Sequence, residues 1–438
     1  MKGTWRQMRS FDRCLQLLMV NQFGINLGFY MLMPYLANHL SSGLDMAAWT
    51  VGLVLGVRTL SQQGMFLVGG MLADRLGYKP MIMLGCGLRT VGFALLGVAS
   101  DLPVLLVASV ATGLAGALFN PAVRAYVAAQ AGERRVEAFA AFNVFYQAGI
   151  LIGPAVGLAL ISLNFRVVCL TAATIFLVLT VVQVRALPAR SAGAQVGSQA
   201  GLSGVLADWR EVIGNRPFLM FSLAMVGSYV LSSQIYLALP LQAAAVLGGH
   251  GEVGSSALFA LSAVVAVVGQ VRVTGWARQR WDSGRAVAIG LALMAMAFLP
   301  LAASAWIQSP KSSIGAALAF LPALAATMLL TLGTVMAYPF EMDTIVVLAR
   351  ERLVATHYGL YNTFAGIGMT VGNLATGAIW GLAQQWDLPA LPWVALAATG
   401  AVCATAVARL ARSRQLGAGS APLAPLPTAT VTQGAGPR

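Results

Sequence analysis

Long apolar runs are the feature that most restricts how this chain can fold. A helix of about 20 apolar residues spans the hydrocarbon core of a bilayer, and lipid offers no partner for backbone groups that a helix or a closed barrel leaves free. Twelve such runs follow one another, at residues 14–37, 49–70, 80–99, 103–126, 138–162, 166–185, 216–241, 254–275, 285–306, 314–338, 356–382 and 390–408. The sequence therefore predicts an all-α polytopic membrane protein with twelve transmembrane helices.

The composition excludes an ordinary soluble protein. Hydrophobic residues make up 58% of the chain and charged residues 9%, against about 45–50% and about 25% in soluble domains. The net charge is +13, but the basic residues lie between the apolar runs rather than in one patch. They concentrate at both ends of the chain and in alternate connections, whereas the other connections hold only Arg166 and Lys311. By the positive-inside rule both termini are cytoplasmic, and no nucleic-acid partner is expected.

A short pattern recurs at half the length of the chain, which indicates two related halves. Asn143, Phe145, Gly149 and Gly153 recur 219 positions later as Asn362, Phe364, Gly368 and Gly372. Such a repeat is typical of membrane proteins built from two pseudo-symmetric bundles. We expect a cytoplasmic N-terminus (1–13), an N-terminal six-helix bundle (14–185), a linker (186–215), a C-terminal six-helix bundle (216–408) and a disordered cytoplasmic tail (409–438). The linker should hold a short amphipathic helix, either on the membrane surface or packed beneath the bundles.

The fifth apolar run contains helix-weakening residues at a regular spacing. Gly149, Gly153 and Gly157 recur every four residues, so they share one helix face, and Pro154 lies among them. Glycines on one face let another helix approach closely. Two interpretations follow: a tight packing seam, or a hinge and seal between two halves that move.

The second connection carries a compact charged motif, Gly69-Gly70-Met71-Leu72-Ala73-Asp74-Arg75-Leu76-Gly77-Tyr78-Lys79. It resembles the cytoplasmic signature of the major facilitator superfamily, G-x-x-x-D-R-x-G-[RK]-[RK]. The matching residues are Gly70, Asp74, Arg75, Gly77 and Lys79, and Tyr78 replaces one basic residue. The resemblance implies a gate on the inner face, in which Asp74 would pair with Arg124 at the end of the fourth span. The alternative is a rigid turn whose charges only set topology.

The fifth run resembles the antiporter signature of the same superfamily, G-x-x-x-G-P-x-x-G. Segments 56–58, 62–64, 79–82, 119–121 and 165–169 add a resemblance to the multidrug-resistance MdtH-like exporters of the drug:proton antiporter group. The resemblance implies the major facilitator fold and an inner (plasma) membrane location. It further implies export of small amphiphilic compounds by alternating access, by a monomer surrounded by membrane lipid. It implies no cofactor, with the proton gradient as the energy source.

Three departures from the antiporter pattern bear on proton coupling. The fourth span has Ser109 where many such antiporters have an arginine, and the acid that related exporters carry in the first span falls on Asn21. The only acids near a span interior are Glu341 and Asp343. Asp74, Glu341 and Asp343 are therefore the candidates for proton coupling, and the coupling itself is implied by the resemblance.

Two arginines fall near the middle of predicted spans. Arg58 and Arg89 each lie nine residues inside a span boundary, which corresponds to roughly 13 Å of depth. A cation at this depth costs about 2.5–3.5 kcal/mol on insertion scales, so it needs a purpose. It either holds an anionic substrate group or is structural, with Arg58 reaching Gln62. Further candidates for a substrate cavity are Asn21, Asn143, Gln147, Gln234 and Asn362.

Three functions remain open at this stage. Multidrug efflux follows from the resemblance. The arginine pair favours a second function, export of one anionic metabolite or metal chelator, either with or without proton coupling. A receptor or scaffold that has lost transport is the third. The sequence has no nucleophile–base pair and no cysteine or histidine spacing that would bind a metal, so we expect neither an enzyme nor a metal site.

Overall fold

The computed structural model describes residues 2–188, 202–306 and 313–413, and in these ranges the chain is helical, without β-strands. The first part consists of α1 (Lys2–Arg9), α2 (Arg13–Asn38), α3 (Ala48–Gly64), α4 (Phe66–Leu76), α5 (Tyr78–Val98), α6 (Leu102–Ala131), α7 (Arg135–Ile161) and α8 (Phe165–Ala186). The second part consists of α9 (Leu202–Gly214), α10 (Arg216–Ser233), α11 (Ala238–Leu247), α12 (Gly251–Arg278), α13 (Ser283–Met296), α14 (Leu299–Ser304), α15 (Ser313–Leu348), α16 (Val354–Gln385) and α17 (Leu391–Arg412).

These helices account for the twelve predicted spans. Within the described ranges, eight elements are long and apolar enough to cross a membrane, and the bent pair α3–α4 makes a ninth. One of the eight, Leu102–Ile161, contains both α6 and α7. The helices α2 and α16 have 26 and 32 residues, enough to cross a bilayer, but carry more polar side chains. The prediction of an all-α polytopic membrane protein is confirmed.

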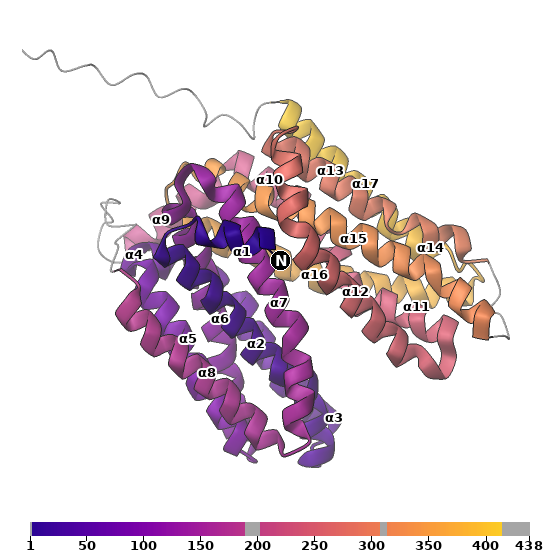
Figure 1. Ribbon diagram of the computed structural model, residues 1–438, viewed down its shortest axis with the longest axis horizontal. Helices are drawn as coiled ribbons and strands as arrows, with labels where there is room; N and C mark the ends of the chain where they lie inside the picture. The colour runs from indigo at the N-terminus through magenta and orange to yellow at the C-terminus, as the bar shows by residue number, and fades with distance from the viewer. Residues whose placement is uncertain (1, 189–201, 307–312, 414–438) are drawn as a thin grey trace, which may run out of the picture.

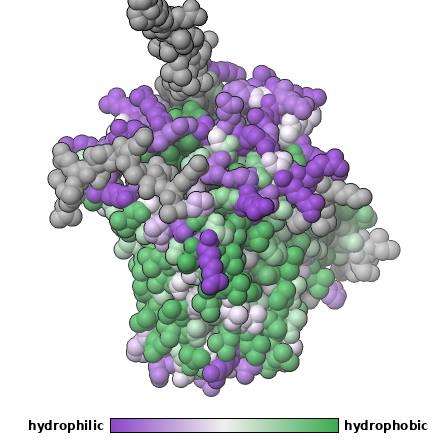
Figure 2. Space-filling view, turned by 60° about the vertical axis from the view of Figure 1, so that its left-hand side comes forward, coloured by the Kyte–Doolittle hydropathy of each residue, from purple (hydrophilic) through white to green (hydrophobic). Residues whose placement is uncertain are grey.

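The helices form two bundles that meet at one end. Figure 1 shows α2–α8 as one bundle, which we call the N-half, and α10–α17 as a second, the C-half. The two bundles meet near α10 and α16 and diverge toward α3 and α11. The meeting end is called the basic end, because the ion pairs of Arg75, Arg135, Arg278 and Arg352 lie there, and the opposite end is the far end. In Figure 2 hydrophilic residues gather at the upper end and apolar residues cover the flank below, as expected for a bilayer-spanning protein.

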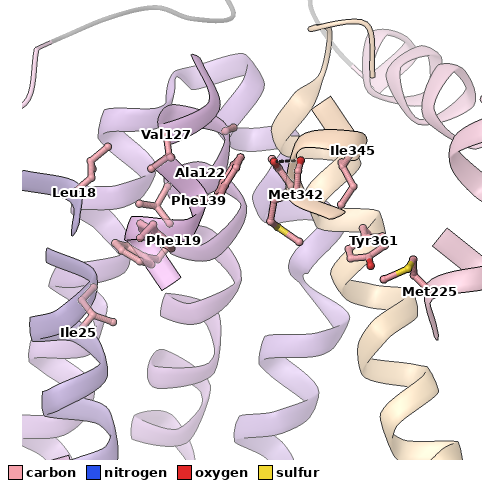
Figure 3. Close-up of a cluster of buried hydrophobic side chains, with 14 of the residues drawn as sticks. Leu18, Ile25, Phe119, Ala122, Val127, Phe139, Met225, Met342, Ile345 and Tyr361 are labelled. Carbon is pink, nitrogen blue, oxygen red and sulfur yellow. Dashed lines mark hydrogen bonds between the residues drawn. The ribbon is translucent and has the colours of Figure 1, made fainter. Parts of the chain in front are cut away.

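Buried apolar side chains fill both bundles. Figure 3 shows Phe119 and Phe139 of the N-half near Met342 and Tyr361 of the C-half, all 2% exposed or less. Aromatic and branched side chains at this burial exclude water and lipid from the helix contacts. The core therefore continues from one half to the other at the level of these residues.

Three spans are broken rather than continuous. The bend of 46° between α3 and α4 lies at Met65, directly after Gly64. A short 3-10 segment, Gln234–Tyr236, separates α10 from α11, and Pro240 follows in the first turn of α11. After the break that ends α13, α14 begins at Leu299 with Pro300 in its first turn. Proline cannot donate to the preceding turn and glycine has little preference for a helix, so both permit such breaks.

The linker and the tail lie only partly within the described residues. The helix α9 lies where the amphipathic pattern occurs in the linker, whereas residues 189–201 lie outside the described residues. The expected tail begins later than 409, because α17 continues to Arg412. The remainder of the expected tail, from 414 onward, lies outside the described residues.

Candidate functional site

One close approach between the halves is a backbone contact between α4 and α16. A Cβ atom added at Gly70 would overlap the carbonyl oxygen of Ala355, and one added at Gly359 would overlap that of Phe66. Only glycine fits at these two positions, because the backbones themselves are in contact. The signature glycine Gly70 thus lies in the contact between the halves, and the facing helix supplies a glycine of its own.

Asp74 of the N-half caps a helix of the C-half. Its carboxylate accepts hydrogen bonds from the backbone N–H of Ala355 (3.1 Å) and Thr356 (2.7 Å) and from the Thr356 hydroxyl (2.7 Å). The Tyr78 hydroxyl donates a fourth at 3.3 Å. A carboxylate at the first turn of a helix satisfies free N–H groups and interacts favourably with the helix dipole. The residue before α16, Leu353, is left-handed (φ 49°), so the helix begins abruptly at this carboxylate.

The predicted pairing of Asp74 with Arg124 is wrong. Arg124 Nη1 instead donates to Asn362 Oδ1 of α16 at 2.7 Å. The anion therefore has a helix N-terminus as its partner, and the cation has an amide in the other half. Depth along the sequence placed both charges at one level but could not show which neighbour each would face.

The two repeated asparagines occupy equivalent places across the halves. Asn362 of the C-half binds Arg124 of the N-half, and Asn143 of the N-half donates to Gln270 Oε1 of the C-half at 2.6 Å. From the sequence, both asparagines are candidates for a substrate cavity. In this conformation they join the halves, through the donor group of Asn143 and the acceptor oxygen of Asn362. Asn362 Nδ2 has no hydrogen-bond partner among the described residues.

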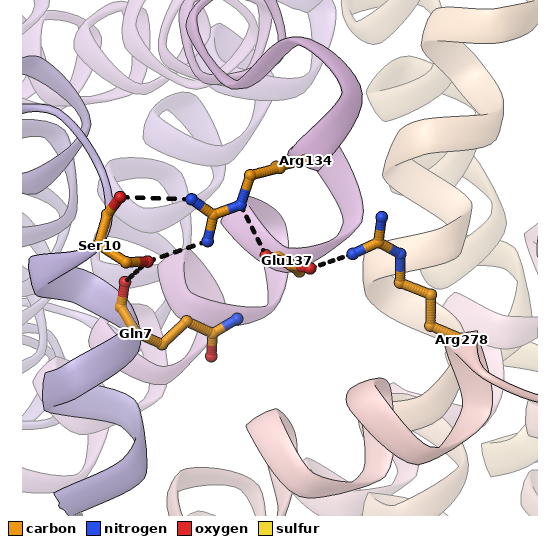
Figure 4. A network of polar contacts seen from close by, with 5 residues as sticks. All are labelled: Gln7, Ser10, Arg134, Glu137 and Arg278. Atoms are coloured by element: carbon orange, nitrogen blue, oxygen red, sulfur yellow. Dashed lines mark hydrogen bonds and ion pairs between the residues drawn. The ribbon is translucent and has the colours of Figure 1, made fainter.

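Ion pairs close the basic end outside these contacts. Arg135 of α7 binds Asp343 (2.8 Å) and Glu351 (2.7 Å) of the C-half. Figure 4 shows a second connection, in which Glu137 is paired with both Arg134 and Arg278, and Arg134 also contacts Ser10. Apart from Asp343, these residues are not among the predicted site residues. Charges at span ends are visible in sequence, but which of them cross between the halves depends on the fold.

The remaining signature residues tie the N-half to its own connections. Arg75 Nη2 lies 2.6 Å from Asp208 Oδ2 of the linker helix α9. Lys79 donates to the carbonyl oxygens of Leu187 (2.6 Å) and Val184 (3.0 Å) at the end of α8, where a cation is favoured by the helix dipole. Gly77 has φ 96°, a conformation that favours glycine, and it separates α4 from α5. The linker helix is thus packed beneath the bundles.

The glycine face of α7 lies within the N-half and not between the halves, which favours the packing-seam interpretation over the hinge-and-seal interpretation. Gly149, Gly153 and Gly157 all pack on α2 within the N-half: an added Cβ would lie 2.7 Å from Asn26 Cβ at Gly149 and 2.9 Å from Tyr30 Cβ at Gly153. The carbonyl oxygen of Pro154 accepts a hydrogen bond from the Tyr35 hydroxyl of α2 at 2.8 Å. The packing-seam interpretation describes this contact.

The corresponding glycines of the repeat make the corresponding contact. Gly368 and Gly372 of α16 pack on Val226 and Val230 of α10 within the C-half. The contacts α2–α7 and α10–α16 are therefore related by the sequence repeat. What the sequence repeats is a mode of helix packing.

Arg89 lies inside the N-half and not in an open cavity. It is 6% exposed and lies over the rings of Phe29, Phe119 and Phe176, at 5.8, 5.6 and 5.9 Å from their centroids. Cation–π contacts of this kind stabilise a desolvated guanidinium. Its Nε has no hydrogen-bond partner among the described residues. This geometry favours the structural interpretation for Arg89.

Arg58 is more accessible than Arg89. Its side chain is half-buried, lies 5.5 Å from the Phe29 centroid and donates to Gln62 Oε1 at 3.3 Å, as the structural interpretation expected. It also lies near the Tyr30 hydroxyl, which in turn is close to those of Tyr146 and Tyr236. Arg58 therefore borders an aromatic region to which both halves contribute.

Of the other cavity candidates, Asn21 and Gln234 are packed inside their own halves. Asn21 is fully buried and accepts a hydrogen bond from Gln183 of α8 at 2.6 Å, so its assignment to the substrate cavity is wrong. Gln234, also fully buried, donates to Val230 at 2.7 Å and to Asn373 at 3.2 Å, which stabilises the break in its span. Gln147 is half-buried on α7.

Glu341 is a carboxylate enclosed in the C-half. It is 4% exposed and accepts hydrogen bonds from the hydroxyls of Tyr361 (2.5 Å) and Tyr229 (2.9 Å). No salt bridge to it occurs among the described residues. The charge of Arg124 acts on Glu341 without direct contact. Burying a carboxylate that has no direct ion pair is costly, so such groups in membrane proteins mark functional sites.

The chain is similar to known transporters over most of its length. The sequence profile of the Major Facilitator Superfamily matches residues 18–373. An uncharacterized MFS-type transporter of Mycobacterium tuberculosis is 50% identical over 402 residues, which cover 92% of this chain and 94% of the relative. The multidrug resistance protein MdtH of Edwardsiella ictaluri is 28% identical over 388 residues, which cover 87% and 90%.

Solved structures show the same fold. The E. coli fucose:proton symporter FucP aligns with a TM-score of 0.68 at 16% identity, over 90% of this chain and 98% of the symporter. The human organic anion transporter MFSD10 aligns with a TM-score of 0.63 at 15% identity, over 90% and 99%. These proteins are transporters and not enzymes. The chain is a multi-pass membrane protein with the major facilitator fold, and it belongs to the Major Facilitator Superfamily.

Proposed function

We propose that this protein exports small amphiphilic compounds from the cytoplasm by alternating access, in exchange for protons. The observation that carries the proposal is the one-sided closure of the molecule. The hydrogen bonds, ion pairs and glycine contacts described above that join the halves lie at the basic end, or just beyond it at the level of Asn143 and Gly366. Past this level the span is bent by 46° between α4 and α3.

The basic end corresponds to the cytoplasmic face by the positive-inside rule, with both termini there and the protein in the cell membrane. The conformation described is then closed to the cytoplasm and faces outward. Export requires this end to open, so the contacts of Gly70, Asp74, Arg124 and Arg135 must break in each cycle. Polar contacts suit this role, because water replaces them when the halves part.

The substrate class rests on the relatives and on the aromatic region between the halves. Curated relatives at 28% identity are multidrug resistance proteins. Phe29, Tyr30, Tyr146 and Tyr236 offer large apolar faces with hydroxyl groups, a surface that accepts amphiphilic molecules of varied shape. Gln62, which binds Arg58, supplies an amide group at the border of this region, and we propose that Gln147 of α7 supplies another. One protomer contains this whole region, so we propose a monomer that needs no cofactor.

Proton coupling is assigned to Glu341. Its carboxylate faces two tyrosine hydroxyls and no cation within direct contact among the described residues, so a proton would remove a buried charge. Asp343 is instead held by Arg135 at the surface of the basic end, and we assign it to gating rather than to coupling. Asp74 already has four donors and is likewise assigned to the gate.

Export of an anionic compound is the second candidate function. Arg58 and Arg89 both lie near Phe29, and the Nε of each lacks a hydrogen-bond partner among the described residues. Neither arginine forms an ion pair with an acid in the part of the chain that the structure describes. An anion could neutralise the accessible arginine, Arg58, while Arg89 contributes only at a distance.

The test uses everted membrane vesicles with an imposed pH gradient and a fluorescent pH reporter. Cationic, neutral and anionic compounds are added in turn to vesicles with the native chain, Glu341→Gln or Arg58→Gln. Collapse of the gradient by cationic or neutral compounds, lost in Glu341→Gln and kept in Arg58→Gln, supports the first proposal. Collapse by anions alone, lost in Arg58→Gln, supports the second. Substrate flux without collapse of the gradient would show that transport is not coupled to protons under either candidate function.

A further inference from the structure

A cavity of about 650 Å³ lies at the far end of the C-half, among α11, α15, α16 and α17. Its volume is in the range of ligand-binding pockets, about 300–1,000 Å³. None of the described residues that line it belongs to the N-half or to the aromatic region between the halves. Pro322 of α15 is one of the lining residues, and Glu341 follows it in the same helix at roughly 28 Å along the axis. The cavity is therefore separate from the site to which we assign proton coupling.

The break between α10 and α11 explains why the cavity exists. Before the break α10 packs on α16, where Val230 meets Gly372. After the break α11 packs on α12 and α15 instead. The last turns of α16 thus lose the neighbour that covers its earlier turns. Trp380 lies in these last turns and lines the cavity.

Two tryptophans form one wall of the cavity. Trp380 and Trp393 make a T-shaped contact, with ring centroids 5.4 Å apart, and Trp393 also stacks on Phe298 at 6.4 Å. Trp393 is 2% exposed, so packing fixes the orientation of its ring. The face of an indole ring attracts a cation within about 6 Å of its centroid. Elsewhere the lining includes apolar side chains such as Val246 and Leu318, which would contact an apolar body.

The charge at the cavity is negative. Asp387 is the one charged residue among the described residues that line it. It lies in the exposed connection between α16 and α17 and forms no ion pair among the described residues. Gln242 and Gln384 add amide groups to the lining. A carboxylate beside indole rings in a mostly apolar cavity attracts a cation and repels an anion.

We infer that this cavity binds an organic cation with an apolar body, such as an aromatic quaternary ammonium compound. The cationic group would lie between Asp387 and Trp380, and the apolar body would lie against Leu318 and Val246. With the basic end at the cytoplasm, as proposed above, the ligand reaches this site from outside the cell. The inference goes beyond the export function, because this site requires neither movement of the halves nor Glu341.

The first test is isothermal titration calorimetry of the purified protein in detergent with benzyltrimethylammonium. An anion of similar size, 4-tert-butylbenzoate, is titrated for comparison. Asp387→Asn removes the charge and keeps a residue type that accepts the left-handed backbone at this position (φ 53°). Asp101→Asn, at another exposed connection of the far end, is the matched control.

We expect the native chain to bind the cation at least tenfold more tightly than the anion. The dissociation constant of the cation should rise at least tenfold in Asp387→Asn and stay unchanged in Asp101→Asn. No saturable binding of the cation to the native chain, or equal affinities for the cation and the anion, would overturn the inference. An equal loss of affinity in both variants would do the same.

The aromatic wall is tested by replacing one tryptophan. Trp386→Leu is the control for Trp380→Leu, because Trp386 is 61% exposed and does not line the cavity. We expect the cation to bind at least fivefold more weakly to Trp380→Leu and with native affinity to Trp386→Leu. Native affinity in Trp380→Leu would show that the cation does not bind at this wall.

Cysteine protection locates the bound cation. Ala245→Cys places a thiol on an exposed lining position of α11, and Leu163→Cys places one at the far end of the N-half as a control. The four native cysteines are buried. We expect benzyltrimethylammonium to slow maleimide labelling of Ala245→Cys several fold and to leave labelling of Leu163→Cys unchanged. Unchanged labelling of both, or equal slowing of both, would contradict the proposed location.

The variant Glu341→Gln distinguishes this site from the transport site. Cation binding that is kept in Glu341→Gln and lost in Asp387→Asn supports the inference, even if no compound is exported. Cation binding that is lost in Glu341→Gln and kept in Asp387→Asn would place the cation between the halves and overturn the inference, while the export function would stand.

Discussion

Asp74 is the residue whose role is best defined by its contacts. Four donors surround its carboxylate, three of them from the first turn of α16 in the other half. A helix N-terminus is a directional partner, since its N–H groups and its dipole point at one place. When the halves separate, both the Asp74 carboxylate and the N-terminus of α16 lose these partners. Opening of the gate therefore removes the cap of α16.

Replacing Asp74 by Asn should weaken the closed basic end. Hydrogen bonds to a charged group contribute about 1.5–3 kcal/mol each, which corresponds to a roughly ten- to hundredfold shift in the balance between the two conformations. We expect transport to fall by at least tenfold at equal expression, as measured in everted vesicles. Asp101→Asn, at an exposed connection at the far end, is the control and should transport normally. Normal transport by Asp74→Asn would contradict the gating role.

A second prediction concerns the protonation of Glu341. Tyr361→Phe removes the shorter of its two hydrogen bonds, that at 2.5 Å, without changing the shape of the site. The charged carboxylate loses a donor, so protonation becomes easier and the pH dependence of transport should move to higher pH. Thr405→Val, on an exposed side chain of α17, is the control. An unchanged pH profile of transport by Tyr361→Phe would contradict the assignment of proton coupling to Glu341.

At the scale of elements, α7 has two faces with different tasks. Its first turns bind the C-half through Arg135, Glu137 and Asn143, while its glycine face binds α2 within the N-half. The antiporter-like motif therefore holds the N-half together as one body. A bundle that must move as a unit needs a contact of this kind, in which backbones meet directly.

Gly157→Val should destabilise the N-half rather than block its motion. The added atoms would overlap the backbone of Met31 in α2, and overpacking of this kind costs about 1–3 kcal/mol. We expect a lower thermal unfolding temperature of the purified protein in detergent. Gly87→Val is the control, because a Cβ there meets nothing within 4 Å among the described residues. An unchanged unfolding temperature with lost transport would restore a hinge role.

The pair Arg135–Asp343 allows the connection between α7 and α15 to be tested by exchange. Arg135→Asp or Asp343→Arg alone places like charges together at the basic end. Coupling between directly contacting residues is about 0.5–3 kcal/mol, so the double variant should recover most of the transport lost by each single variant. Additive losses in the double variant would show that the two residues act separately.

The elements were predictable from the sequence, whereas most contacts between the halves were not. Apolar periodicity and alternating basic connections defined twelve spans, because each of these signals is local. The internal sequence repeat also corresponds to repeated packing, at Gly149 and Gly368. The partners of Asp74 and Arg124 and the burial of Asn21 were assigned wrongly, since depth along a span does not say which neighbour a side chain faces.

At the scale of the whole molecule, the two halves are joined at one end and apart at the other. The joined end combines a helix cap, two amide contacts between the halves and ion pairs, and each of these is replaceable by water. A single span on each side, α3–α4 and α16, reaches from the joined end toward the separated end.

The most direct test of this account is a reversible lock at the joined end. Arg135→Cys and Asp343→Cys, introduced together, are linked with a short, reducible, bifunctional thiol reagent, and transport is measured before linking, after linking and after reduction. Each single-cysteine variant, treated in the same way, is the control. We expect linking to abolish transport in the double variant only, and reduction to restore it. Undiminished transport with the lock in place would contradict the claim that this end opens in every cycle.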